Sequence, residues 1–210
     1  MNISDARLYL VARASVGGRP LAELMPDLAA AGVDLLQLRE KEMEAGEILR
    51  VGAPIRAACR EAGVPFIIND RPDVALALDA DGVHLGQNDL PVETGRRILG
   101  DAIVGVSTHS EDEIDVATAS PQRIDYIAVG PVHETPTKPG RPGTGLGLLH
   151  HAARVVDVPW FVTGNMNAGT LPEAMEAGAR RAVVVRGITE APDPVSAAAE
   201  LRAILEQYPL

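Results

Sequence analysis

Two patterns of apolar and polar positions alternate along the chain. Short runs of consecutive apolar residues are separated by longer segments in which apolar residues recur every three or four positions. Continuous apolar runs are typical of parallel strands that are buried on both faces, and the longer spacing is typical of amphipathic helices. The runs predict eight strands: Leu8–Val11, Leu35–Leu38, Phe66–Ile68, Gly82–Leu85, Ile103–Val106, Tyr126–Val129, Phe161–Val162 and Ala182–Val185.

The segments between these runs have helical periodicity. After the first run, Leu21, Leu24, Leu28 and Ala31 fall on one side of a helix. The segment after the second run repeats the pattern with a longer set of residues: Ile48, Val51, Ile55, Ala58, Cys59 and Ala62. A helix is therefore expected after each predicted strand.

Repeated strand and helix units of this kind predict a closed (β/α)8 TIM barrel, because right-handed crossovers between parallel strands have few other solutions. The alternative is an open doubly wound sheet, which normally has a GxGxxG motif after its first strand. Here the first run leads into ARASVGGRP, which does not match that motif. The chain has no linker rich in glycine or serine, so we expect residues 1–210 to form a single domain.

The composition limits the kind of core and the kinds of partner that this chain can have. Hydrophobic residues make up 46% of the chain but aromatic residues only 3%, so the core must consist mainly of aliphatic side chains. The net charge of −10 argues against a nucleic-acid partner, which would require a basic face. Cys59 is the only cysteine, and its place on the apolar side of a predicted helix indicates a buried structural thiol rather than a nucleophile.

The beginning of the chain, MNISDARLYLVAR, has Asp5 and Arg7 where a signal peptide would need an unbroken apolar run. No later segment approaches the roughly 18 apolar residues of a membrane span. These features predict a cytoplasmic protein without a membrane partner. They leave open whether the chain forms a homo-oligomer.

Two carboxylates follow neighbouring predicted strands. Asp70 comes directly after PFIIN, and Asp89 follows GVHLGQN. Adjacent parallel strands lie about 4.8 Å apart and end at the same edge of the sheet, so one divalent cation could bridge both side chains. Mg²⁺ is commonly held by one or two carboxylates together with phosphate oxygens of a substrate. The sequence therefore predicts a magnesium site that binds a phosphate-bearing substrate.

The alternative for each carboxylate is a cap on the helix that follows it. Asp70 precedes RPDVALAL and Asp89 precedes LPVETGRRIL, and aspartate is a favoured N-cap residue. His84 lies inside a predicted strand, where a hydrogen-bonded histidine facing the core or the barrel interior is more common than a metal ligand.

Polar side chains also follow most of the other strands, and active sites of TIM barrels lie at these carboxyl ends. Residues 133–145 form a loop rich in proline, glycine, threonine and cations, too long for a simple connection and typical of a lid or binding loop. The glycine-containing loops after the last two strands, with Gly164 and Arg186, stand where barrels bind phosphate through backbone N–H groups. Two anion sites are therefore expected, one with a metal ion and one without.

In combination, the motifs at the strand ends resemble those of the thiamine phosphate synthase family. They occur in the family's order and spacing along almost the whole chain: QLREK, IIND, GVHLGQNDLP, GVSTHS, GPVHETPTK and VVVRGIT. The resemblance implies a (β/α)8 barrel that joins hydroxymethylpyrimidine diphosphate to thiazole phosphate and releases pyrophosphate. It implies small-molecule substrates and Mg²⁺ as the cofactor.

The resemblance also implies a role for each matching residue. Asp70 and Asp89 match the Mg²⁺ ligands, and Gln37 and Ser107 match residues on the pyrimidine side. The diphosphate contacts correspond to Arg39, Lys41, Asn69 and Lys138, and the thiazole phosphate contacts to Thr135, Thr137, Gly164, Val185 and Arg186. Within this set, catalysis is assigned to Lys41, Lys138 and Ser107. The chain departs from the family pattern at Asn165, where a second glycine is common, and at Arg186, where a smaller residue is common.

Three other functions fit parts of the pattern. A thiazole tautomerase-like or regulatory paralogue would share the barrel without the full diphosphate site. A phosphosugar isomerase or epimerase would need an acid and base pair, for which Asp70 with His84 or Asp89 is the candidate. A binding barrel without turnover would keep only the anion sites.

Overall fold

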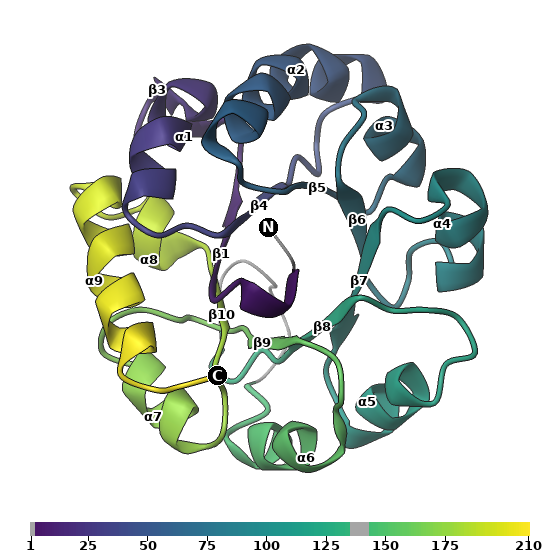
Figure 1. The fold of residues 1–210 in the computed structure, drawn as a ribbon, viewed down its shortest axis with the longest axis vertical. Helices are drawn as coiled ribbons and strands as arrows, with labels where there is room; N and C mark the ends of the chain where they lie inside the picture. Colours follow the sequence, from purple (N-terminus) through teal and green to yellow (C-terminus); the bar gives the residue numbers. More distant parts are fainter. Residues whose placement is uncertain (1–2, 135–142) are drawn as a thin grey trace.

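The computed structural model describes residues 3–134 and 143–210, and its centre is a closed barrel of parallel strands (Figure 1). Going round the barrel, the strand order is β1-β10-β9-β8-β7-β6-β5-β4. Their bounds are β1 (Leu8–Ala12), β4 (Leu35–Leu38), β5 (Phe66–Asn69), β6 (Gly82–Leu85), β7 (Ile103–Thr108), β8 (Tyr126–Val129), β9 (Trp160–Val162) and β10 (Ala182–Val184). The predicted TIM barrel is confirmed.

Helices form an outer ring around the strands (Figure 1). They are α1 (Leu21–Ala30), α2 (Ala45–Ala62), α3 (Pro72–Ala77), α4 (Val92–Leu99), α5 (Glu111–Thr118), α6 (Gly147–Val155), α7 (Leu171–Glu176), α8 (Arg186–Thr189) and α9 (Pro194–Glu206). A 3-10 helix, η1 (Ile3–Asp5), precedes β1, and a small antiparallel hairpin of β2 (Ser15–Val16) and β3 (Arg19–Pro20) follows it. No helix of the described part is long and apolar enough to cross a membrane.

The strands appear in the sequence as continuous apolar runs because both faces of each strand are buried. One face lies in the outer core, between strands and helices, and the other lies in the inner core, inside the barrel. In β1, Leu8 and Leu10 point outward and pack with the helices, whereas Tyr9 and Val11 point into the barrel. Successive side chains of a strand point to opposite faces, so every residue of a doubly buried strand must tolerate burial. Cys59 belongs to the outer core, as predicted, and its burial raises the pKa of the thiol to about 12.

Three aromatic rings fill the inner core. Tyr9, Tyr126 and Phe161 meet edge to face, with ring centroids 5.4 to 5.6 Å apart. Space for the Tyr126 ring comes from Gly105 on the neighbouring strand, where an added Cβ would lie 2.0 Å from the ring. These rings form a rigid layer below the carboxyl ends of the strands.

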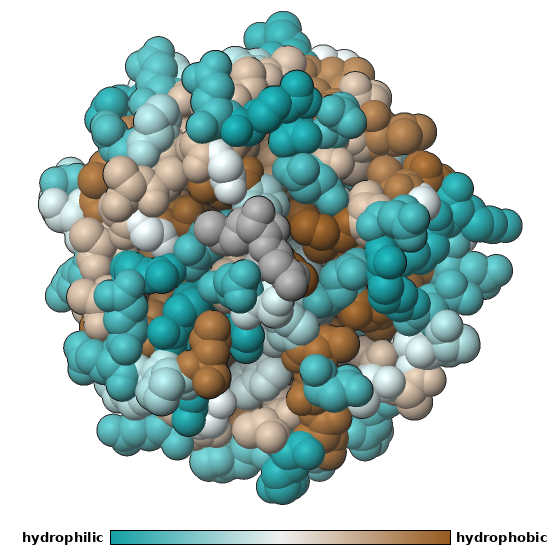
Figure 2. Space-filling model, in the orientation of Figure 1, coloured by the Kyte–Doolittle hydropathy of each residue, from teal (hydrophilic) through white to brown (hydrophobic). Residues whose placement is uncertain are grey.

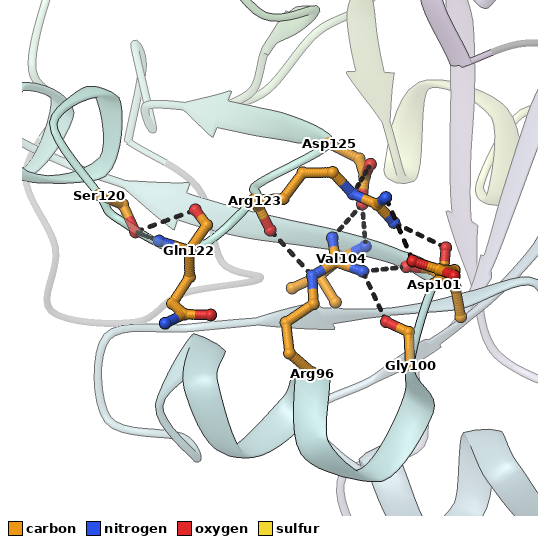
Figure 3. A network of polar contacts seen from close by, with 9 residues as sticks. Arg96, Gly100, Asp101, Val104, Ser120, Gln122, Arg123 and Asp125 are labelled. Atoms are coloured by element: carbon orange, nitrogen blue, oxygen red, sulfur yellow. Dashed lines mark hydrogen bonds and ion pairs between the residues drawn. The ribbon is translucent and has the colours of Figure 1, made fainter.

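A pair of one aspartate and one arginine, termed a clamp, occurs three times at the amino-terminal end of the barrel. An aspartate directly before a strand accepts a hydrogen bond from a backbone N–H of the preceding strand and pairs with an arginine of an outer helix. The pairs are Asp34 with Arg202, Asp81 with Arg56 and Asp125 with Arg96. Figure 3 shows the last clamp, in which Val104 N–H donates to Asp125 over 2.8 Å. Figure 2, in the orientation of Figure 1, shows hydrophilic residues over much of this view.

Two local predictions need correction. The last predicted strand extends to Val185, but β10 ends at Val184 because Val185, with φ −117° and ψ −92°, is the N-cap residue of α8. The loop expected after it is therefore a single helical turn. The hairpin of β2 and β3 was not predicted, because each of its strands has only two residues.

Candidate active site

A pocket opens at the carboxyl ends of the strands. It collects inward-facing side chains of β1, β4, β5, β6 and β7 on one side and the loops after β9 and β10 on the other. The predicted substrate residues among its lining are Gln37, Arg39, Asn69, Ser107, Gly164, Val185 and Arg186. These residues are far apart in the sequence and come together because every strand of the barrel ends at this side.

The floor of the pocket is a chain of hydrogen bonds above the aromatic layer. Gln37 donates its amide Nε2–H to the Tyr9 hydroxyl, which lies 2.7 Å from the Tyr126 hydroxyl. His84 joins the chain, with its Nδ1 3.0 Å from Tyr126 and its Nε2 2.9 Å from the Ser107 hydroxyl. The prediction that His84 is a hydrogen-bonded group of the barrel interior is confirmed.

Asp70 and Asp89 lie side by side at the rim. Burial would raise the pKa of Asp70, but hydrogen bonds from Lys41 and from the Asp89 carboxyl outweigh it and lower the pKa. Burial and the neighbouring Asp70 carboxylate both raise the pKa of Asp89. Asp70 is therefore paired with Lys41, whose Nζ is 2.8 Å from Asp70 Oδ2, and Asp89 makes no ion pair within residues 3–134 and 143–210.

Neither carboxylate caps the helix that follows it, so the capping alternative is wrong. The cap position of α3 is Arg71 and that of α4 is Pro91, and neither helix has a side-chain cap. Asp89 instead accepts a hydrogen bond from the Gly86 N–H over 2.6 Å, which closes the turn after β6. Asp70 has a positive φ of 63° and donates its own N–H to the His84 carbonyl. The backbone thus turns both carboxylates toward each other rather than toward a helix.

Arginine and lysine place two cations beside the two carboxylates of this rim. The Arg39 guanidinium makes no side-chain hydrogen bond to any other described residue, and burial lowers its pKa against the opposing effect of Asp70. Lys41 lies two residues further along the chain and contacts Asp70. Cations held close to a shielded pocket create the potential that an anionic substrate needs.

The loops after β9 and β10 provide the opposite wall. Within the described residues, the N–H groups of Gly164, Asn165, Arg186 and Gly187 donate none of the loop hydrogen bonds, and all four residues line the pocket. Unpaired N–H groups of this kind are suited to phosphate oxygens. Asn165 has φ 54°, a left-handed conformation that asparagine adopts more readily than most residues, so the change from glycine keeps the backbone path.

Loop packing also requires glycine at position 164. A Cβ at this position would lie 2.4 Å from Val132 N and 2.6 Å from Pro131 Cα. The missing side chain therefore permits two loops to pack against each other. Arg186 pairs with Glu190 over 2.8 Å and also lines the pocket.

The donor set at the rim fits Mg²⁺. The two carboxylates lie next to each other, Lys41 is the nearest cation among the described residues, and both carboxylates offer the hard oxygen ligands that this ion prefers. Residues 3–134 and 143–210 contain no group of three or more histidine, cysteine, aspartate or glutamate side chains arranged for a metal ion. A cation at Asp70 and Asp89 would therefore take its remaining ligands from water or from a substrate.

Comparison with known proteins identifies the family. The family model described as thiamine monophosphate synthase matches residues 8–188. The chain belongs to this family. A thiamine-phosphate synthase of Acidothermus cellulolyticus is 47% identical over 97% of both chains, and one of Streptomyces avermitilis is 50% identical over 94% of this chain and 93% of its own.

A solved structure of the family agrees over the full length. The thiamine phosphate pyrophosphorylase from Pyrococcus furiosus covers 98% of both chains with a TM-score of 0.87 and 30% sequence identity. The family's barrel is therefore the fold of this chain, and differences between members are expected in side chains and loops.

Sequence reasoning missed part of the floor of this pocket. Tyr9 and Tyr126 connect Gln37 to His84, although both were treated only as members of apolar runs. A signal was present, since a buried tyrosine hydroxyl needs a partner and both tyrosines occupy inward positions of their strands. Three predicted residues, Thr135, Thr137 and Lys138, lie outside the described residues.

Proposed function

We propose that the chain condenses 4-amino-5-hydroxymethyl-2-methylpyrimidine diphosphate with 4-methyl-5-(2-phosphoethyl)thiazole, giving thiamine phosphate and pyrophosphate. Family membership over nearly the whole chain supports this reaction. The single observation of the site that carries it is the pair of facing carboxylates, Asp70 and Asp89, beside Lys41 and Arg39. This arrangement is suited to a diphosphate with its Mg²⁺.

The reaction asks the protein for position and charge rather than for a nucleophile. The thiazole nitrogen attacks the methylene carbon of the pyrimidine, and the bond from that carbon to the diphosphate oxygen breaks. When bound, Mg²⁺ neutralises charge on the departing diphosphate, and Asp70 and Asp89 would hold it. Arg39 and Lys41 bind the same group by charge, together with the amide of Asn69.

The remaining pocket residues orient the two substrates. Gln37 and Ser107 bind the pyrimidine ring at the floor, and Gly164, Val185 and Arg186 bind the thiazole phosphate at the opposite wall. Thr135, Thr137 and Lys138 are proposed to complete the two anion sites. Holding both reactants in one shielded pocket replaces a bimolecular encounter by an oriented one, which is a large part of the rate enhancement expected here.

The proposed reaction is tested by product analysis. The purified chain is incubated with both precursors and Mg²⁺, and thiamine phosphate and pyrophosphate are quantified, with each component omitted in turn. Equal amounts of the two products, dependent on all three components, are expected. Binding of both precursors without products would instead favour a regulatory or binding barrel.

We further propose that residues 1–210 form one domain that acts in the cytoplasm as a Mg²⁺-dependent transferase, without a nucleic-acid or membrane partner. The net charge of −10 supports the assignment without a nucleic-acid partner. A single cooperative unfolding transition would support one domain, and two separate transitions would contradict it.

A further inference from the structure

Glu40 stands between two cations of the proposed reaction, Arg39 and Lys41, in the motif QLREK. Arg39 lines the pocket, and Lys41 contacts Asp70 at the rim. The Glu40 side chain is only 5% exposed, although glutamate is seldom buried without a partner. Its carboxylate contacts the segment that follows β1. Three consecutive side chains are therefore directed to three different places.

The two contacts of the Glu40 carboxylate differ in strength. Its Oε1 accepts a hydrogen bond from the Ala14 N–H over 2.7 Å, and its Oε2 lies 4.0 Å from Arg13 Nε. The Arg13 side chain is 63% exposed and also pairs with Glu42 over 3.7 Å, so this ion pair contributes little in water. A hydrogen bond from a backbone N–H to a carboxylate is among the stronger kinds. The bond to Ala14 is therefore the contact that holds Glu40.

This hydrogen bond joins the loop after β4 to the base of the hairpin formed by β2 and β3. The base of the hairpin is itself fixed, because the N–H of Leu21, the first residue of α1, donates to the Ala14 carbonyl over 2.9 Å. On the β4 side, the Arg39 N–H donates to the Ala12 carbonyl over 2.9 Å. The backbone at positions 39 and 40 is thus bound twice to the end of β1 and the residues after it.

The Arg39 side chain depends on this backbone because it has space on two sides. It lines the active-site pocket and also a second cavity of about 330 Å³, which lies between the hairpin and α8. Its guanidinium makes no side-chain hydrogen bond to another described residue that would choose between the two spaces. An arginine side chain has many rotamers, so its place is set mainly by the position of its backbone.

We propose that Glu40 is a positioning residue, whose hydrogen bond to Ala14 holds the backbone that directs Arg39 and Lys41 toward the diphosphate. This inference rests on the proposed function, because it takes the diphosphate as the group that these two cations bind. A displacement of about 1 Å far from the chemistry can cost about 100-fold in rate, so a contact outside the pocket can govern binding inside it. The wall formed by the loops after β9 and β10 does not depend on this bond, so the thiazole phosphate should be affected little.

Two substitutions separate the reach of the side chain from its charge. Glu40→Asp keeps the charge but is one methylene shorter, which takes the carboxylate out of reach of the Ala14 N–H. Glu40→Gln keeps the length and an oxygen acceptor but removes the charge. Glu40→Asp should raise the KM for the pyrimidine diphosphate about 10-fold and the KM for the thiazole phosphate less than about twofold. Glu40→Gln should change neither KM by more than about threefold.

The control is Glu42→Gln, which changes the exposed partner of Arg13 and should match the unmodified chain in both KM values. Amide hydrogen exchange of Ala14, measured by NMR without substrates, reads the bond itself. Exchange should be slow in the unmodified chain and in Glu40→Gln, and fast in Glu40→Asp.

Four results would overturn the proposal. They are an equal rise of both KM values in Glu40→Asp, a larger effect of Glu40→Gln than of Glu40→Asp, slow exchange of Ala14 in Glu40→Asp, and unfolding of Glu40→Asp, which would show a purely structural role. If the unmodified chain forms no thiamine phosphate, the proposed function fails, and the exchange of Ala14 still decides whether Glu40 holds this loop.

Discussion

Replacing Asp89 by asparagine separates its proposed metal role from its structural role. Asparagine keeps an oxygen that can accept the 2.6 Å hydrogen bond from Gly86, and Asp70 keeps its 2.8 Å contact with Lys41. The pKa of Asp89 is raised in the folded protein, so the ionised form is disfavoured there. Above that pKa, the charge on Asp89 therefore lowers the free energy of unfolding. Without Mg²⁺, Asp89→Asn should therefore be at least as stable as the unmodified chain.

With Mg²⁺ the order should reverse. A ligand that binds only the folded state at about 100 times its Kd adds about 2.7 kcal/mol of stability. For a chain of 210 residues, each kcal/mol corresponds to a Tm change of about 2–4 °C. The unmodified chain should thus gain about 5–10 °C on addition of Mg²⁺ with pyrophosphate, and Asp89→Asn should gain much less.

Thermal unfolding with and without Mg²⁺ and pyrophosphate provides the assay, together with the rate of thiamine phosphate formation. Asp101→Asn is the control, because the Asp101 side chain is fully exposed and precedes β7, at the opposite end of the barrel. It should behave like the unmodified chain. An Asp89→Asn variant with an undiminished Mg²⁺-dependent Tm gain and full activity would refute the metal assignment.

Three further predictions follow from the contacts described above. Lys41→Met removes the half-exposed partner of Asp70. It should lower kcat about 100-fold and change the free energy of unfolding by less than about 1 kcal/mol. A large loss of stability together with the loss of kcat would indicate a structural role for Lys41. Gly105→Ala places a methyl group against the Tyr126 ring and should cost at least about 1–3 kcal/mol in denaturant unfolding. Gly46→Ala, in open space, is its control and should cost nothing. Cys59 should resist alkylation in the folded protein, because with a pKa of about 12 only about one thiol in ten thousand is ionised at about pH 8; rapid labelling without unfolding would contradict its burial.

The barrel could be predicted because both faces of its strands are buried, which makes each strand a continuous apolar run in the sequence. In β1, Leu8 and Leu10 face the helices and Tyr9 faces the interior, so the run has no polar gap. Strand ends were less predictable, since Val185 is apolar but belongs to the turn into α8. The clamps at the amino-terminal end, such as Asp125 with Arg96, depend on partners distant in sequence, which periodicity does not reveal.

The site was predictable where chemistry and strand ends coincide. Asp70 and Asp89 follow adjacent strands, so their proximity is a consequence of barrel geometry. The role of Gly164 was not predictable, because it depends on the approach of Pro131 and Val132 from another loop. The link from Gln37 to His84 through two tyrosines likewise required the three-dimensional arrangement, since a sequence does not show which buried hydroxyls meet.

Counting bound metal ions tests the central claim most directly. Mn²⁺ replaces Mg²⁺ in many oxygen-ligand sites and is visible by electron paramagnetic resonance. Titrated into the chain with pyrophosphate, Mn²⁺ should bind at one site per chain, and that site should disappear in both Asp70→Asn and Asp89→Asn. Undiminished binding in either variant would show that these two carboxylates do not share a cation.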